Sequence, residues 1–182
     1  MNDTAPTSSQ PGAALPADDP RRHLAVANSD DKGLRHIGIS GGDTYTIVLT
    51  GQDTNGRYCL IDMLIPPGGG PPPHRHDFEE MFTVLEGELA VTFRGEENVA
   101  GVGTTVNSPA NAPHAFTNKT GKPTRLLCIC SPAGQEEFFM AVGVPVEGRT
   151  TSPPRLTKAE QADQTRRAEM LAPKYRTEFL TA

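Results

Sequence analysis

The chain of 182 residues has no run of lysine and arginine, its formal net charge is -5, and aromatic residues make up only 5% of it. Binding to a nucleic-acid backbone needs a basic surface that contacts many phosphates, so this composition argues against a nucleic-acid partner. The chain also has no apolar run as long as a membrane-spanning helix requires. We therefore expect neither nucleic acid nor a membrane as a partner.

Cysteine is scarce, with three residues in the whole chain. Cys128 and Cys130 alternate on one predicted strand, so they point the same way and lie too close in sequence for an ordinary disulfide. We interpret them as small apolar residues of a packed strand in a reducing compartment. Arg21-Arg22 is followed by only a short stretch, 23–27, that runs straight into the polar residues 28–31 and leaves no export helix, and the N-terminus lacks the basic region and apolar core of a secretory signal. These features predict a cytoplasmic protein.

Apolar residues are also sparse toward the two ends of the chain. Residues 1–33 are rich in Pro, Ala, Ser, Thr and Asp without an apolar period, which is typical of a disordered arm. We predict a disordered N-terminal arm over residues 1–33, a single β-barrel domain over 34–146, and a linker with a C-terminal helix over 147–182.

Short segments with alternating apolar residues fill the middle of the chain. Residues 44–50 read as a strand, and a turn follows over 51–56. Residues 57–65 place four apolar side chains on one face before Pro and Gly end the run at 66–70. Further short segments of this kind are separated by glycine or proline. The pattern predicts an all-β fold, a small antiparallel double-sheet β-barrel.

Beyond Pro132 the pattern changes to helix. Residues 135–142 contain Phe138 and Phe139, which could pack over one end of the barrel. Thr157 and Glu160 form a capping-box signature for a second helix that should stop near Pro173. Four apolar residues at its end could dock on the barrel or on a partner subunit, so a homodimer is an expectation: Leu171, Tyr175, Phe179 and Leu180.

Three of the five histidines, His74, His76 and His114, fall with Glu80 at spacings that suit one metal ion inside a small barrel. Side chains repeat every second residue on a strand, so His74, His76 and Glu80 can point to one face, whereas Glu79 points to the other. Imidazole and carboxylate together suit one divalent transition metal ion, which could be Fe, Mn, Ni, Co, Cu or Zn, better than calcium or magnesium.

The two remaining histidines, His23 and His36, have no partners of this kind in the sequence. We interpret both as exposed residues without a function.

Two stretches of the chain resemble the two motifs of the cupin superfamily, over roughly residues 44–132. They read Gly68-x5-His74-x-His76-x3-Glu80-x6-Gly87 and Gly103-x5-Pro109-x-Asn111-x2-His114-x3-Asn118. Asn111 stands where the family usually has glycine, and asparagine is the next residue to tolerate left-handed backbone, so we expect the turn to persist. The resemblance implies the cupin or jelly-roll barrel and the metal ligands His74, His76, Glu80 and His114.

Among cupins, the single-domain layout more loosely resembles bacterial flavonol (quercetin) 2,3-dioxygenases, including residues 51–58 and 131–139. This resemblance implies a dioxygenase that takes O2 and an aromatic or enolic, flavonol-like molecule bound to the metal through oxygen. Four ligands in a six-coordinate site would leave two positions free for such binding. Glu80 is the only nearby proton acceptor that the sequence offers, so it is the candidate catalytic residue.

The side chains expected around the metal are apolar and suit a flat substrate. They are Met63, Phe82, Val84 and Phe116. Because cupins perform several reactions on similar ligands, two alternatives stay open. One is a redox-neutral metal-dependent isomerase or lyase, and the other is a non-catalytic protein that binds a small molecule.

Overall fold

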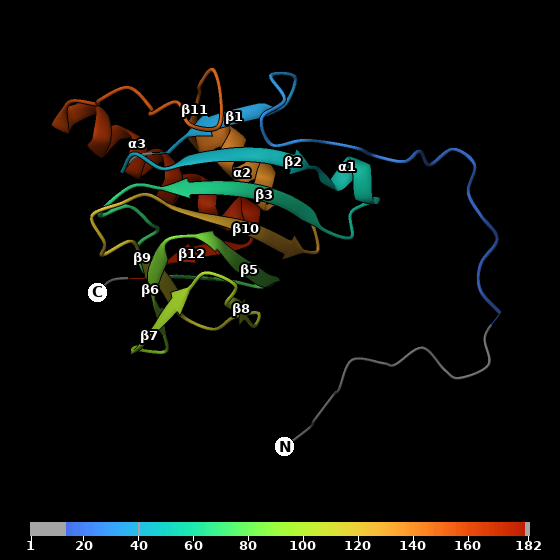
Figure 1. Cartoon of the computed structure of the whole chain (residues 1–182), viewed down its shortest axis with the longest axis horizontal. Helices are drawn as coiled ribbons and strands as arrows, with labels where there is room; N and C mark the ends of the chain where they lie inside the picture. The colour runs from blue at the N-terminus through green and yellow to red at the C-terminus, as the bar shows by residue number, and fades with distance from the viewer. Residues whose placement is uncertain (1–13, 40, 181–182) are drawn as a thin grey trace.

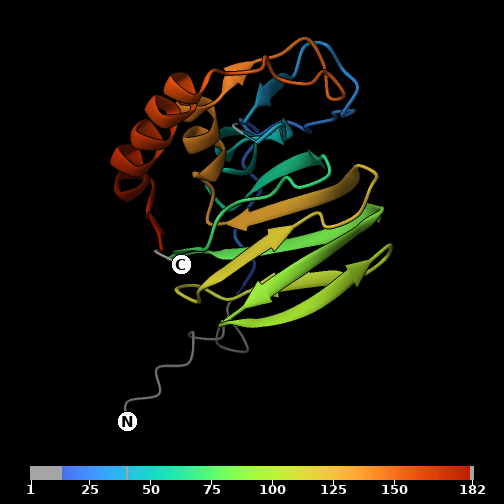
Figure 2. The same cartoon turned by 90° about the vertical axis from the view of Figure 1, so that its left-hand side faces the viewer.

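The computed structural model describes residues 14–39 and 41–180. Its body consists of two antiparallel sheets that pack face to face (Figures 1 and 2). The larger sheet has seven strands in the order β11 (Val144–Pro145), β1 (Arg35–Gly38), β2 (Thr44–Leu49), β3 (Cys59–Ile65), β10 (Thr124–Ser131), β5 (Glu79–Glu86) and β8 (Thr105–Ser108). The smaller has five in the order β12 (Thr177–Phe179), β4 (His74–His76), β9 (His114–Thr117), β6 (Glu88–Phe93) and β7 (Glu96–Gly101). The predicted all-β, double-sheet fold is confirmed.

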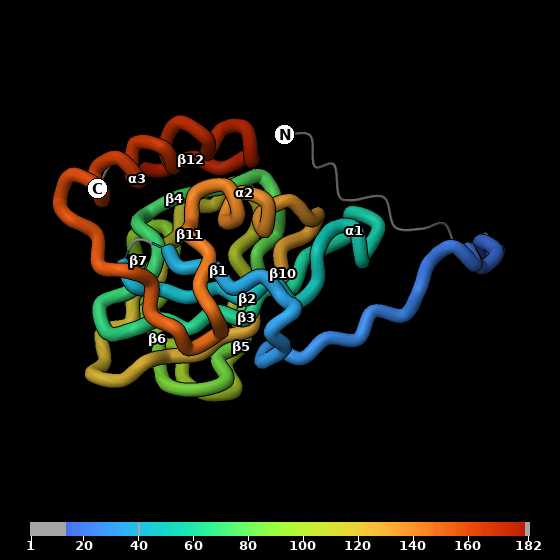
Figure 3. Tube along the Cα trace, turned by 90° about the horizontal axis from the view of Figure 1, so that it is seen from above, coloured from blue at the N-terminus to red at the C-terminus, as the bar shows by residue number. Residues whose placement is uncertain are grey.

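Four helical segments join this body. They are α1 (Gly51–Thr54), α2 (Gln135–Val142), α3 (Lys158–Leu171) and the 3-10 helix η1 (Ala172–Tyr175). The views in Figures 2 and 3 place α2 and α3 next to each other on one side of the sheets. In the described part of the chain, no helix is both long enough and apolar enough to cross a membrane.

The apolar alternation of the strands determines the core. On β3, every second residue from Cys59 to Ile65 is at most 1% exposed. The register pairs Met63 with Tyr45 on β2 and with Leu126 on β10, so these side chains lie on the same inner face. Phe116 of the smaller sheet packs in the same core. Burial of each large apolar side chain contributes roughly 1.5–3 kcal/mol, so this face holds the two sheets together.

Both predicted helices are confirmed, whereas part of one predicted turn is helical. The helix α2 has the predicted bounds, and α3 begins after Thr157, whose hydroxyl accepts a hydrogen bond from the Glu160 amide in the predicted capping box. In the segment expected to be a turn, residues 51–54 form the short helix α1 instead. Thr50 caps its start, and Asn55, with a left-handed backbone at φ 56°, ends it.

The C-terminal segment contains a strand that the sequence did not indicate. Strand β12 pairs antiparallel with β4, with Thr177 opposite His76 and Phe179 opposite His74. The apolar residues at the end of α3 and beyond it were expected to dock on the barrel or on a partner subunit. In the structure they contact other residues of the same chain. Leu171, Tyr175 and Phe179 pack with Phe138 of α2.

His36 is a correction to the sequence analysis, because it is buried. The histidine lies on β1 opposite Thr46, only 5% exposed, with Nδ1 2.8 Å from the Thr46 hydroxyl and Nε2 3.1 Å from the Asp31 carbonyl oxygen. The next residue, Ile37, lies in the core, so His36 points to the opposite face of the sheet, where Asp31 of the preceding segment contacts its ring. His23 is exposed, as expected.

Part of the predicted arm, residues 1–13, lies outside the described residues. Residues 14–34 contain no helix or strand, and none of them is buried. The last part of this segment nevertheless contacts the domain, because Asp30 forms an ion pair with Arg149 at 2.9 Å and the Asp31 carbonyl faces His36.

We expect that a chain beginning at Asn28 keeps its free energy of unfolding within about 0.5 kcal/mol of the full-length value, as removal of exposed residues usually does. A chain beginning at Leu34 should lose about 1–2 kcal/mol, because Nε2 of the buried His36 then lacks its partner. Urea denaturation of the three chains measures both values. A loss clearly above about 0.5 kcal/mol in the chain that begins at Asn28 would contradict this expectation.

Candidate metal centre

Three strands from the two sheets bring the four predicted ligands together. His74 and His76 lie on β4, His114 lies opposite His74 on β9, and Glu80 comes from β5 of the other sheet. Their ligand atoms all lie within 4.8 Å of one another. The four residues are only 3–6% exposed, so the cluster is closed off from bulk water.

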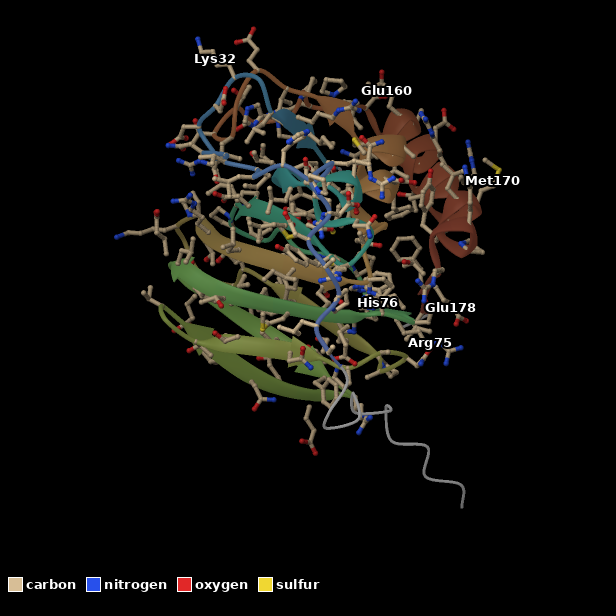
Figure 4. All side chains as sticks on the ribbon, turned by 90° about the vertical axis from the view of Figure 1, so that its right-hand side faces the viewer. Lys32, Arg75, His76, Glu160, Met170 and Glu178 are labelled. Atoms are coloured by element: carbon tan, nitrogen blue, oxygen red, sulfur yellow. The ribbon has the colours of Figure 1, made fainter. Side chains whose placement is uncertain are left out.

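The alternation on β4 and β5 separates these side chains from their neighbours. Between the two inward histidines, Arg75 points outward and donates to Glu178 of β12 at 2.6 Å; Figure 4 labels both beside His76. Glu79 also points outward, as predicted, and accepts hydrogen bonds from the Asn107 side chain at 2.8 Å and the Ala110 amide at 3.1 Å. Glu80, not Glu79, therefore supplies the carboxylate of the cluster.

Each of the three imidazoles is oriented by a backbone carbonyl two residues away. Nδ1 lies 2.9 Å from the Pro72 oxygen in His74, 2.8 Å from the Phe78 oxygen in His76, and 2.8 Å from the Ala112 oxygen in His114. Because a carbonyl oxygen only accepts, Nδ1 carries the hydrogen, and in the neutral ring the lone pair is on Nε2. Hydrogen bonds of this kind orient histidine ligands in metal sites.

The Glu80 carboxylate faces two of these Nε2 atoms. Its Oε2 lies 3.0 Å from Nε2 of His114 and 3.4 Å from Nε2 of His76, while the Cys128 thiol donates to Oε1 at 3.3 Å. A carboxylate oxygen and an imidazole lone pair are both acceptors, so the contact is favourable only with a positive charge between them. A proton or a metal ion can supply that charge.

The pKa values of the cluster reflect the same contacts. Burial lowers the pKa of His74 to about 4, so this imidazole is neutral at neutral pH. Burial raises the pKa of Glu80, but the hydrogen bonds with His114 and His76 outweigh it and hold that pKa well below its usual range. For His114, burial lowers the pKa, and the bond to Glu80 raises it more. Neutral imidazole and ionised carboxylate are the forms that bind a metal ion.

The nearby cysteines do not offer thiolate ligands. Cys128 and Cys130 form a second group with Glu80, and they are buried, free thiols on the inner face of β10. The hydrogen bond with Cys130 lowers the pKa of Cys128, but burial and the neighbouring charges raise it further, to about 12. Both thiols therefore stay protonated, as expected of packing residues. Three nitrogens and one carboxylate oxygen remain as the donor set, and this set fits a divalent transition metal.

A cavity of about 300 Å³ adjoins the cluster, and His74 and Glu80 line it. Of the four predicted pocket residues, Met63 and Phe116 line this cavity, whereas Phe82 and Val84 do not. Phe82 packs on Phe116 at 5.4 Å between ring centroids and belongs to the core, as does Val84. Parity places a side chain on the inner face, but the packing between the sheets decides whether it reaches the cavity.

The other cavity walls come from residues that strand alternation does not indicate. Phe138, Phe139 and Val142 of α2 cover one side, in line with the expectation that this helix packs over the barrel. Two polar lining residues, Asp43 and Gln164, had no distinguishing signal in the sequence.

Asn111, which stands where the second motif usually has glycine, forms the turn as predicted. Asn111 has φ 68°, in the left-handed region, and its amide donates to the His76 carbonyl at 2.6 Å. The next residue, Ala112, carries the carbonyl that orients His114. The turn at Asn111 thus connects both histidine strands.

Comparison with known proteins identifies relatives of the barrel. Residues 61–130 match the cupin domain family (Cupin_2). Quercetin 2,3-dioxygenase of Bacillus subtilis is 27% identical over 111 residues, which is 60% of this chain and 33% of that protein. The chain thus matches only a third of the length of this relative.

Among solved structures, a predicted oxalate decarboxylase of Thermotoga maritima has a TM-score of 0.54 and 18% identity, and the match covers 59% of this chain and 98% of that one. A polyketide cyclase of Streptomyces resistomycificus has a TM-score of 0.50 and 22% identity, over 73% and 89% of the two chains. At these identities the likeness concerns the fold alone.

We expect His76→Ala and His114→Ala each to lower the apparent affinity for a divalent transition metal by at least about 100-fold, because losing a ligand should cost no less than losing its hydrogen-bond partner. Metal analysis after equilibrium dialysis measures the loss, and circular dichroism should show the β structure retained. His23→Ala, at an exposed histidine, is the control. Full metal occupancy in both ligand variants would refute the cluster as the metal site.

Asn111→Val should lower the free energy of unfolding by about 1–2 kcal/mol, since a β-branched residue resists the left-handed conformation. Asn111→Gly should stay within about 0.5 kcal/mol of the wild type. Asn98→Val, on the exposed face of the extended strand β7, is the matched control and should cost nothing. Equal losses for Val at positions 98 and 111 would contradict the backbone explanation.

Proposed function

We propose that the chain is a metal-dependent dioxygenase that acts on a small aromatic or enolic molecule such as a flavonol, and the match of residues 61–130 to the cupin domain family supports this. The observation that carries this proposal is that His74 and Glu80 belong both to the four-residue cluster and to the cavity wall. A molecule in the cavity can therefore reach the cluster, while His76 and His114 do not line the cavity.

The residues that would hold the metal are His74, His76, Glu80 and His114. A divalent ion there, whether Fe, Mn, Ni, Co, Cu or Zn, would supply a Lewis acid that stabilises negative charge on a substrate oxygen. The chain itself keeps the imidazoles turned inward through the three Nδ1 hydrogen bonds. It also excludes bulk water from this cluster, which strengthens every electrostatic interaction inside it.

The shape and polarity of the cavity support a flat, weakly polar substrate. Its volume of about 300 Å³ is that of a small-molecule site. Met63 and Phe116 form its wall from the sheets, and Phe138, Phe139 and Val142 form its wall from α2. Aromatic side chains stack on an aromatic ring and provide no positive charge for a nucleotide phosphate.

Glu80 is the proposed proton acceptor for a substrate hydroxyl that enters the cluster. Its carboxylate lines the cavity, and the Cys128 thiol donates to Oε1 while Oε2 faces the histidines. The two oxygens thus have separate partners, which holds the carboxylate plane in one orientation. The relative from Bacillus subtilis, named a quercetin 2,3-dioxygenase, supports the choice of a flavonol as the first substrate to test.

We expect the metal-loaded protein to consume O2 in an oxygen electrode when quercetin or a simpler phenolic enol is added. Glu80→Gln keeps the size of the side chain but removes its charge and basicity. It should lower kcat by about 100-fold or more, as loss of a general base does, and reduce metal content much less. The adjacent Glu79→Gln is the matched control, because Glu79 points away from the cavity, and it should leave kcat and metal content unchanged.

The same assay separates the dioxygenase from the two alternatives. Turnover that continues unchanged under strict anaerobiosis would identify a redox-neutral isomerase or lyase instead. Binding of the same molecules without any turnover, with or without O2, would identify a small-molecule-binding protein. Equal kcat values for Glu80→Gln and the wild type would remove Glu80 from the catalytic role.

A further inference from the structure

The cavity wall carries a second buried acidic residue, Asp43, which immediately precedes β2. Asp43 is only 2% exposed, and its Oδ2 accepts a hydrogen bond from the Tyr45 hydroxyl at 3.1 Å. The other oxygen, Oδ1, is buried without a hydrogen-bond partner. A buried polar atom left unpaired costs about 1–3 kcal/mol, and more when it is charged, so such an atom calls for a donor from elsewhere.

A second unpaired acceptor lies on the wall of the same cavity. The Gln164 side chain on α3 donates from Nε2 to the Val142 carbonyl at 3.1 Å, while its Oε1 is buried and lacks a partner. In the described part of the chain, Asp43 Oδ1 and Gln164 Oε1 are the only buried side-chain nitrogen or oxygen atoms in this condition. Both are acceptors, and both belong to the lining of one cavity, so a single ligand in that cavity can satisfy them.

The position of Asp43, immediately before β2, separates it from the metal cluster. Tyr45 and Glu80 share the inner face, but strands β3 and β10 run between β2 and β5. Three strand spacings amount to roughly 14 Å along the sheet, and less through the cavity because the sheet curves. Met63 of β3 and the aromatic residues Phe116 and Phe139 line the space between. Asp43 and the metal cluster thus lie at separate places on the cavity wall, whose further polar residues are Gln135, Thr165, Glu169 and Thr177.

The negative charge of Asp43 favours a neutral ligand that donates a hydrogen bond from a polar hydroxyl group. Burial raises the pKa of Asp43 to about 6, although the Tyr45 hydroxyl and the Gly70 amide, which does not reach hydrogen-bonding geometry to Oδ1, both lower it. The carboxylate is therefore ionised at pH 8. Lysine and arginine are absent from the lining residues, so the chain provides no cation for it there. A phenolic or enolic hydroxyl makes a strong, charge-assisted bond to such a carboxylate.

We propose that Asp43 and Gln164 bind a second hydroxyl group of the substrate, far from the oxygen that faces the metal cluster. The site then selects aromatic molecules with hydroxyl groups on two sides over analogues with a single one. This inference rests on the proposed function for the first oxygen of the substrate, and it adds the second contact that determines specificity.

Two flavonols test this inference in the metal-loaded full chain. 3-Hydroxyflavone has one hydroxyl group, whereas quercetin has further hydroxyls on both ring systems. Anaerobic fluorescence titration at pH 8 gives both Kd values without turnover. The wild type should bind quercetin at least about tenfold more tightly, as a hydrogen bond to a charged group allows.

Asp43→Asn keeps the shape of the side chain but removes the charge, so it should reduce the preference for quercetin by about tenfold and change the Kd of 3-hydroxyflavone less than about twofold. Gln164→Leu, on a helix at the surface, should also reduce the preference and does not depend on the folding of the Asp43 variant. Asp163→Asn, at the exposed residue next to Gln164, is the control and should leave both Kd values unchanged.

The outcomes distinguish this inference from the proposed function. Equal Kd values for the two flavonols in the wild type, or an undiminished preference in both variants, overturn the second hydroxyl site and leave the proposed function intact. Failure of both flavonols to bind the wild type overturns the inference together with the flavonol-type function. A preference that falls in the Asp43 and Gln164 variants but not in the Asp163 variant supports the inference.

Discussion

The contact of Glu80 with the imidazoles of His76 and His114 is the constraint around which the structure is arranged. The carboxylate belongs to the seven-stranded sheet and the imidazoles to the five-stranded sheet, so the contact connects the two sheets beside the cavity. Because each Nδ1 is already bonded to a backbone carbonyl, the rings cannot turn to offer Nε2 another partner. Two buried acceptors that face each other are costly unless a cation lies between them, and this favours the ionic form of the cluster over an empty, neutral one.

The C-terminal part of the chain adds a strand beside β4 and the helical wall of the cavity. Strand β4 has only three residues and carries two of the four cluster residues, and it is held between β9 and β12. The residues before β12 pack α3 and η1 on α2, and this layer forms the cavity wall opposite the sheets. A cavity with one wall of helices can change its lining through substitutions in α2 and α3 without disturbing the cluster. The four candidate ligands and the helical part of the cavity wall therefore belong to different elements of the fold.

The two polar regions of the cavity also differ in how well they are satisfied. Around the cluster, each histidine Nδ1 has a backbone carbonyl as its partner, and Glu80 contacts two Nε2 atoms and accepts from the Cys128 thiol. In Asp43 and in Gln164, one side-chain oxygen lacks a partner, as expected of a binding site for a hydrogen-bond donor. Native interiors seldom keep such atoms, because each one lowers stability. Their confinement to one cavity points to binding as the reason for their retention.

Local pattern accounts for much of this protein. The inner face of β3, the bounds of α2 and the Thr157 cap each depend on residues within a few positions of one another, and the structure confirms all three. The resemblance of the two motifs to the cupin superfamily is confirmed as well, by the match of residues 61–130 to the cupin domain family. The burial of His36, the place of Phe82 in the core instead of the cavity wall, and strand β12 were not predictable in this way. Thr177 pairs with His76 about a hundred residues earlier, and Asp43 shares a cavity with Gln164 on α3.

The sequence alone determined which side chains face inward and which of them can bind a metal, since strand parity and spacing are local properties. Only the tertiary structure decided which inward side chains border empty space, because that depends on how distant segments pack against one another.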